Sequence, residues 1–153
     1  KEKLDNLLRN VSDNLKPGGK FIGTCLDGKK VFETLKDTNS MYEMDGDELL
    51  WKIIKKYDQD DIRNDDTSIG YPVEVFINSI GKTTMEWLVN FDYLKIAALE
   101  YDLEVETLTE FETMYKLMKK GNTSYGDASK MSDKLKRLSF MHSTFAFVKK
   151  NVD

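Results

Sequence analysis

Hydrophobic residues recur at helical spacing in some stretches of the chain and form short uninterrupted runs in others. Residues 2–15 carry an apolar residue every three or four positions, which predicts an amphipathic helix ended by Pro17 and the two glycines after it. Residues 20–26 form an apolar run without alternation, which predicts a strand covered on both faces, and Gly28 opens a second predicted helix. Helix, tight turn, buried strand and helix is the order typical of a parallel α/β sheet.

The middle of the chain carries a less decisive pattern. Residues 47–58 fit a helix about as well as a strand, and the acidic stretch at 58–68 predicts a solvated loop or an insert. Residues 71–80 are rich in β-forming residues and predict a strand. The strongest helical pattern covers 84–101, where large apolar side chains share one face.

The last third of the chain predicts short elements in alternation. These are a strand at 103–108, a helix at 110–120, a loop at 121–126, a helix at 132–138 and a closing strand at 141–150. The helix at 110–120 is expected to turn four large side chains inward, namely Phe111, Met114, Tyr115 and Met118. With 153 residues and no internal repeat, the chain is expected to form one domain.

Composition narrows the classes of function. The formal net charge is −4, so the chain lacks the basic excess of a general nucleic-acid binder, and any RNA contact has to be local. Cys25 is the single cysteine, which excludes an internal disulfide and fits a reducing compartment. No apolar run approaches the roughly 18 residues of a membrane span. The first residue is lysine, from which we expect the chain to start within a longer protein.

Few residues in the sequence suggest a catalytic or metal-binding role by themselves. Pro17–Lys20 resembles part of a phosphate-binding loop, but its glycines follow a helix and precede a strand, so a plain turn is predicted. A single histidine, His142, excludes a multi-histidine zinc site, and both it and Cys25 are expected to be structural. The acidic residues at 58–66 lack the calcium-loop pattern. We therefore predict no metal site and no catalytic acid, base or nucleophile.

Glu86 has two interpretations from the residues alone. Thr83 and Glu86 have the spacing of a capping box at the start of the helix predicted at 84–101, which explains the glutamate without any ligand. In an α/β sheet, however, loops beyond the carboxyl ends of strands line the ligand crevice. A glutamate there could accept hydrogen bonds from the amide edge of guanine.

Three segments resemble the mRNA cap guanine-N7 methyltransferase family, in family order. They are LLRNVSDNLKPGGKFIGTCLDGKKVFETL at 7–35, TTMEWLVNFDYLKIAALEYDLEVETLTEF at 83–111 and STFAFVK at 143–149. The first contains the family's L-x-P-G-G-x-F-I-G-T. The segment TCLDGKKV at 24–31 most resembles the multifunctional capping enzymes of large cytoplasmic DNA viruses. This resemblance implies a location in the host cytoplasm or the virion.

The resemblance implies an α/β, Rossmann-like class I methyltransferase sheet. Such an enzyme moves a methyl group from S-adenosylmethionine to N7 of the GpppN cap of RNA. Glu86 falls on the family glutamate that contacts the cap guanine. Leu26 falls where cellular members often carry a proline beside the cap, and His142 falls near a family tyrosine that lies against the guanine. These three residues are the predicted cap-binding residues.

The family's cofactor motifs are missing from the chain. The acidic-glycine motif, the acidic residue after the second strand and the aromatic-histidine-tyrosine segment do not occur in residues 1–153. We therefore expect the carboxyl-terminal half of the domain, inactive alone, with S-adenosylmethionine held mainly by the absent half. The expected partners are capped RNA, that half, and other capping-enzyme domains or a stimulatory subunit, with no membrane. The alternatives are a non-catalytic methyltransferase-like subunit that stimulates a catalytic partner, and a small-molecule methyltransferase.

Overall fold

The computed structural model describes residues 1–120 and 126–151. The helices are α1 (Glu2–Asn14), α2 (Gly28–Thr34), α3 (Phe91–Leu99), α4 (Phe111–Lys120) and α5 (Asp133–Ser139), with the short 3-10 helices η1 (Asp66–Ser68) and η2 (Gly126–Lys130). The strands are β1 (Lys20–Leu26), β2 (Ser40–Asp45), β3 (Glu48–Lys55), β4 (Pro72–Ile77), β5 (Lys82–Trp87), β6 (Leu103–Glu110) and β7 (His142–Lys149).

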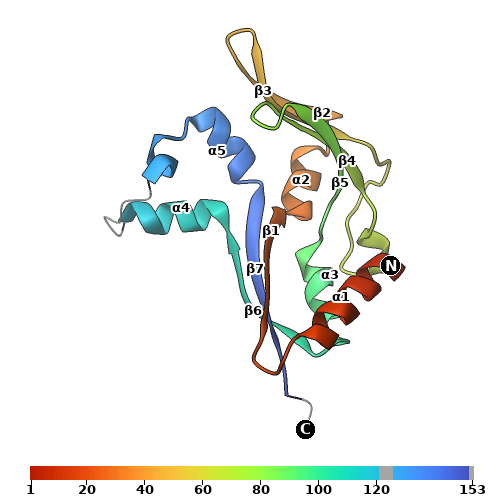
Figure 1. Cartoon of the computed structure of the whole chain (residues 1–153). Coiled ribbons are helices and arrows are strands. Elements are labelled where there is room, and N and C mark those ends of the chain that lie inside the picture. The colour runs from red at the N-terminus through yellow and green to blue at the C-terminus, as the bar shows by residue number, and fades with distance from the viewer. Residues whose placement is uncertain (121–125, 152–153) are drawn as a thin grey trace.

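The strands form two sheets, of order β1-β7-β6 and β2-β3-β4-β5 (Figure 1). Every paired strand in both sheets is antiparallel to its neighbour. β1 and β6 both run against β7, so they point in the same direction on either side of it. The helix–strand order predicted a parallel sheet, which is wrong for every described strand pair, although β1 and β6 run in the same direction. It did not predict that the last strand of the chain lies between them.

One face of the first sheet packs against α1 and α3. Leu8 of α1 and Ala98 of α3 are fully buried in one cluster with Phe145 and Phe147 of β7. The opposite face is open around Ile22 of β1, which is 70% exposed, whereas Leu26 at the end of the strand is buried. The prediction that β1 is covered on both faces is therefore wrong here. An uninterrupted apolar run is compatible with a second cover, but no described element supplies one around Ile22.

The second sheet curls over α2, as Figure 1 shows. Its inner face contributes Trp51, Ile53 and Val73, each fully buried, to a cluster with Val31 and Leu35. This arrangement resolves the ambiguous stretch at 47–58, which forms a strand. Its partner β2 was not predicted. The acidic segment at 58–68 is irregular apart from η1, as expected.

The long helix predicted at 84–101 is wrong in its first half. Lys82–Trp87 forms β5, paired along its length with β4, and the helix begins only at Phe91. Asn90 caps α3 through its side-chain oxygen, so Thr83 and Glu86 form no capping box. Residues 84–87 fit the apolar face of a helix, but they form a strand because the unpaired backbone N–H and C=O groups of β4 lie beside them.

The remaining predicted elements are confirmed, with their ends shifted by at most three residues. These are α1, β1, α2, β4, β6, α4, α5 and β7. On α4, Phe111, Tyr115 and Met118 are half-buried, but Met114 is exposed, so its predicted inward position is wrong. The loop predicted at 121–126 lies almost entirely outside the described residues.

Candidate functional site

Glu86 lies on β5, at the edge of the second sheet. It is the register partner of Val73 on β4, so its side chain points to the same face of the sheet as that buried valine. Because β5 is the last strand, the Glu86 side chain is nevertheless exposed. Its single described hydrogen bond is a long one, 3.4 Å from the Thr84 hydroxyl to Oε1. Among the described residues, no lysine or arginine pairs with this carboxylate.

His142 begins β7 and is half-buried. Its ring stacks on Phe111 at the start of α4, with ring centroids 5.7 Å apart, and Nδ1 lies 3.1 Å from the carbonyl oxygen of Leu138. The Nδ1 contact connects the ring to the end of α5. Both contacts give the imidazole a fixed orientation, as the structural interpretation expected.

Leu26 is the last residue of β1 and the register partner of His142. Its side chain is only 4% exposed and belongs to the core cluster that contains Val73 and Leu88. The structure therefore brings Leu26 and His142 together on adjacent strands. The Leu26 side chain therefore lies in the core beneath His142 and not at the protein surface.

Glu86 is linked to the end of β1, near Leu26, through the segment that follows β5. The segment that follows it runs alongside the end of β1, where Val89 and Asp27 form an isolated parallel bridge. Burial, and then the nearby negative charges of Asp27 and Glu86, raise the pKa of the Cys25 thiol to about 11. The two carboxylates thus lie near the end of β1, within electrostatic range of one thiol.

The raised pKa makes the Cys25 thiol unreactive in the folded chain. At pH 8 we expect iodoacetamide to alkylate Cys25 about 100-fold more slowly than in the urea-unfolded chain, because the folded thiol has a far smaller thiolate fraction. The rate should rise as the pH increases toward about 11. Mass spectrometry over a time course measures both rates, and equal rates in the folded and unfolded chain would contradict this expectation.

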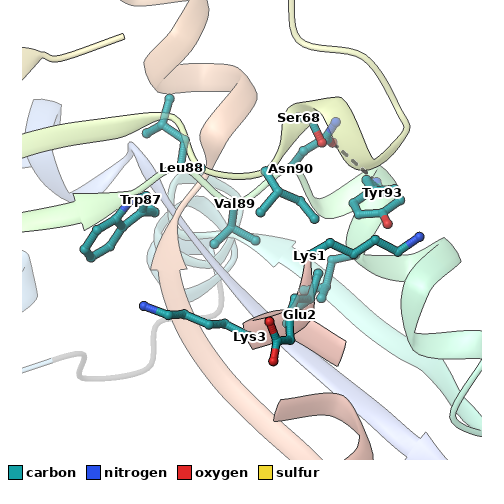
Figure 2. Close-up of a pocket in the computed structure, with 13 residues that line it drawn as sticks. Lys1, Glu2, Lys3, Ser68, Trp87, Leu88, Val89, Asn90 and Tyr93 are labelled. Carbon is teal, nitrogen blue, oxygen red and sulfur yellow. Dashed lines mark hydrogen bonds between the residues drawn. The ribbon is translucent and has the colours of Figure 1, made fainter. Parts of the chain in front are cut away.

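A cavity of about 550 Å³ lies beside this corner, where α1 and α3 begin. Figure 2 shows Val89 between Trp87 and Tyr93, with Lys1 and Lys3 extending beneath them. Leu4, Ile69 and Leu94 add apolar walls. An exposed indole and apolar walls suit a flat ring, and the lysines at the rim lie beside Glu2, so the rim carries charges of both signs.

Sequence reasoning missed this cavity, and none of the three predicted cap-binding residues lines it. Its lining comes from three separate segments, at 1–4, 68–70 and 87–94. The one local signal was Asn90, a good helix-capping residue. It is 4% exposed, and its side-chain amide donates to the carbonyl oxygen of Arg63 at 2.6 Å. That bond ties the acidic segment to the start of α3.

The corner between β1 and α2 offers no open site for the phosphate or ribose of a nucleotide-type cofactor. Of the strand-to-helix corners in residues 1–120 and 126–151, only the one after β1 contains a glycine, Gly28. The backbone of Val89 already fills the space beside it, 2.6 Å from where a Cβ would lie. The neighbouring carboxylate, Asp27, is engaged in capping α2. A pyrophosphate or ribose would find neither open backbone amides nor a free acid there.

The described residues contain neither a candidate metal site nor a helix that could span a membrane. No group of three or more histidine, cysteine, aspartate and glutamate side chains in the described chain could hold a metal ion. Within the same residues, every helix is too short or too polar to span a bilayer.

Comparison with known proteins agrees with this fold and with the resemblance. Residues 1–147 match the model of the mRNA (guanine-N(7))-methyltransferase domain. The chain is also similar to mRNA cap guanine-N(7) methyltransferase 1 of Arabidopsis thaliana, with 34% identity over 116 residues, which are 74% of this chain and 30% of the plant protein. Since that relative is a plant protein, it does not support the viral style of residues 24–31.

A solved structure confirms the fold class. A crystal structure of an S-adenosylmethionine-dependent methyltransferase from Clostridium acetobutylicum matches with a TM-score of 0.51 at 15% identity, over 98% of this chain and 52% of that one. The α/β, Rossmann-like methyltransferase fold predicted from the sequence is therefore present, in a chain that spans about half of that structure. Together with the match over residues 1–147, these findings show that the chain belongs to the mRNA cap guanine-N7 methyltransferase family.

Proposed function

We propose that this chain supplies the acceptor side of an mRNA cap guanine-N7 methyltransferase, and that Glu86 binds the cap guanine. The observation that carries the proposal is the Glu86 carboxylate, which is exposed at the edge of β5 and has no cationic partner among the described residues. A structural glutamate on a strand is usually paired or solvated on an outer face. Glu86 instead shares the inner face of its sheet with Val73.

The chemistry of guanine suits such a carboxylate. Its N1–H and N2 amino group are adjacent donors, and two carboxylate oxygens can accept both bonds. N7 lies on the opposite edge of the base, so it remains free when the donor edge is held. N7 also carries a lone pair and no proton, so methyl transfer to it requires no general base. This chain therefore has to hold the guanine in the correct position for methyl transfer.

Exposed Trp87 follows Glu86 on β5 but points to the opposite face of the strand, where it offers a second contact for capped RNA beside the guanine site. It is 58% exposed at the cavity that Lys1 and Lys3 also line. An indole there can stack on a base of capped RNA, and a lysine can meet its phosphates. Local contacts of this kind are compatible with the net charge of −4.

The other components are part of the proposal. S-adenosylmethionine, which supplies the methyl group, is held mainly by an amino-terminal half of the domain, and this chain is inactive without that half. The partners are the GpppN end of RNA, the amino-terminal half, and other capping domains or a stimulatory subunit. A viral source, with activity in the host cytoplasm or virion, rests on the style of residues 24–31 alone.

Discrimination between two cap analogues tests this function. We expect the complete protein that contains this chain to bind GpppG about 10- to 100-fold more tightly than ApppA, because adenine lacks the N1–H and the N2 amino group. Fluorescence titration of the two analogues measures the ratio. The two ligands carry the same triphosphate, so the comparison isolates the base. Equal affinity would exclude guanine recognition by Glu86.

A further inference from the structure

One corner of the fold contacts both strands that carry candidate cap contacts. It consists of Asp27 and Gly28, between β1 and α2. The backbone N–H of Asp27 donates to the carbonyl oxygen of Met141 at 2.8 Å, and that of Gly28 donates to the carbonyl oxygen of Val89 at 2.9 Å. Met141 directly precedes His142, and Val89 lies three residues after Glu86. The backbone of this corner therefore connects to both sides of the candidate site.

The Asp27 side chain reinforces one of these connections. Its Oδ2 accepts a hydrogen bond of 3.2 Å from the hydroxyl of Ser143, which is 1% exposed and follows His142. Its Oδ1 accepts from the backbone N–H groups of Lys29 and Lys30, at 3.1 Å and 3.3 Å, and so caps α2. One carboxylate thus fixes the start of α2 and the start of β7 relative to the end of β1.

Gly28 allows the other connection. A Cβ on Gly28 would lie 2.6 Å from the carbonyl oxygen of Val89, and 2.8 Å and 2.9 Å from its carbonyl carbon and nitrogen. These are backbone atoms, which cannot turn aside as a side chain would. Only glycine lets the segment after β5 lie against β1 at the distance of the Asp27–Val89 bridge.

We propose that Asp27 and Gly28 are positioning residues, which set the placement of Glu86 relative to His142 so that both can contact one guanine. This proposal rests on the proposed function. Asp27 has no need to touch the substrate, because both of its carboxylate oxygens are engaged within the fold. Its effect reaches the guanine through the two strands.

Kinetics of the Asp27→Ala variant of the complete protein test the proposal. We expect the KM for GpppG-capped RNA to rise about tenfold, since small displacements of binding groups have effects of this order. The KM for S-adenosylmethionine should stay within about twofold, because the corner does not form that site. Asp27→Asn should recover most of the loss, because the asparagine oxygen caps α2 and its amide can donate to the Ser143 hydroxyl.

Two further variants separate this role from general stability. Ser132→Ala removes a helix cap of the same kind, the bond from Leu135 N–H at the start of α5, and should leave both KM values unchanged. If Asp27→Ala does not fold, Ser143→Ala replaces it as the test. It removes only the bond to β7, keeps the α2 cap, and should raise the cap KM about threefold.

Amide hydrogen exchange supplies a readout that does not depend on catalysis. In Asp27→Ala, exchange should accelerate at 86–89 and at 141–145, and less in α1. Unchanged exchange at both segments, or a cap KM that Asp27→Ala leaves unaltered, would overturn the positioning role. Equal binding of GpppG and ApppA by the unmutated protein would instead overturn the proposed function itself.

Discussion

Replacing Glu86 by glutamine lowers kcat/KM for cap methylation by about 100-fold in the complete protein. Glutamine has the same length, but it offers one acceptor oxygen and turns a donor amide toward the N1–H or amino group of guanine. One charge-assisted hydrogen bond is lost, and one donor is left facing another donor. Initial rates of methyl transfer to GpppG-capped RNA measure the effect, and the loss should be greater in KM than in kcat.

A glutamate on the neighbouring strand provides the matched control. Glu74 of β4 is the register partner of Met85, so its side chain lies on the opposite face of the sheet from Glu86. It pairs with Lys56 at 3.3 Å, which is a surface ion pair of small energetic value. Glu74→Gln should therefore leave kcat/KM within about twofold. Similar losses in both variants would mean that the sheet tolerates no glutamine and that Glu86 has no special role.

Elements whose pattern is local could be predicted from the sequence. α1 is amphipathic along its whole length and ends at Asn14, three residues before Pro17, and its buried leucine, Leu8, meets the sheet. β5 could not be predicted in the same way. Thr84 and Glu86 form a strand because Val75 and Val73 of β4 lie opposite them, and this pairing depends on chain folding that no local window contains. The helical pattern at 84–101 was consequently extended too far toward the amino terminus.

The candidate site was only partly predictable for the same reason. Glu86 and His142 were selected by family resemblance, and the structure places them on strands joined through Asp27. Its neighbours in the sequence identify Asp27 only as an ordinary helix-capping residue before Gly28. Its second bond, to Ser143, spans 116 positions of the chain. A residue whose importance lies in a long-range contact of this kind leaves no local signal to detect.

Alanine substitutions of the two tryptophans, Trp51 and Trp87, should have very different effects on the free energy of unfolding. Trp51 is fully buried, its indole N–H donates to the carbonyl oxygen of Lys134 at 2.9 Å, and the Arg137 guanidinium lies 5.7 Å from its ring centre. Trp51→Ala should lower the free energy of unfolding by about 4 kcal/mol, because it leaves a large cavity between the second sheet and α5. Urea denaturation followed by circular dichroism measures the change.

Trp87→Ala removes an equal volume from the surface, where the side chain is 58% exposed, and should change the free energy of unfolding by less than about 0.5 kcal/mol. The same variant should weaken GpppG binding about tenfold if the indole stacks on a base. Equal destabilisation by both substitutions would mean that Trp87 is covered in the folded protein. In that case the cavity beside β5 would belong to the core, and capped RNA would have to bind at Glu86 without an aromatic platform.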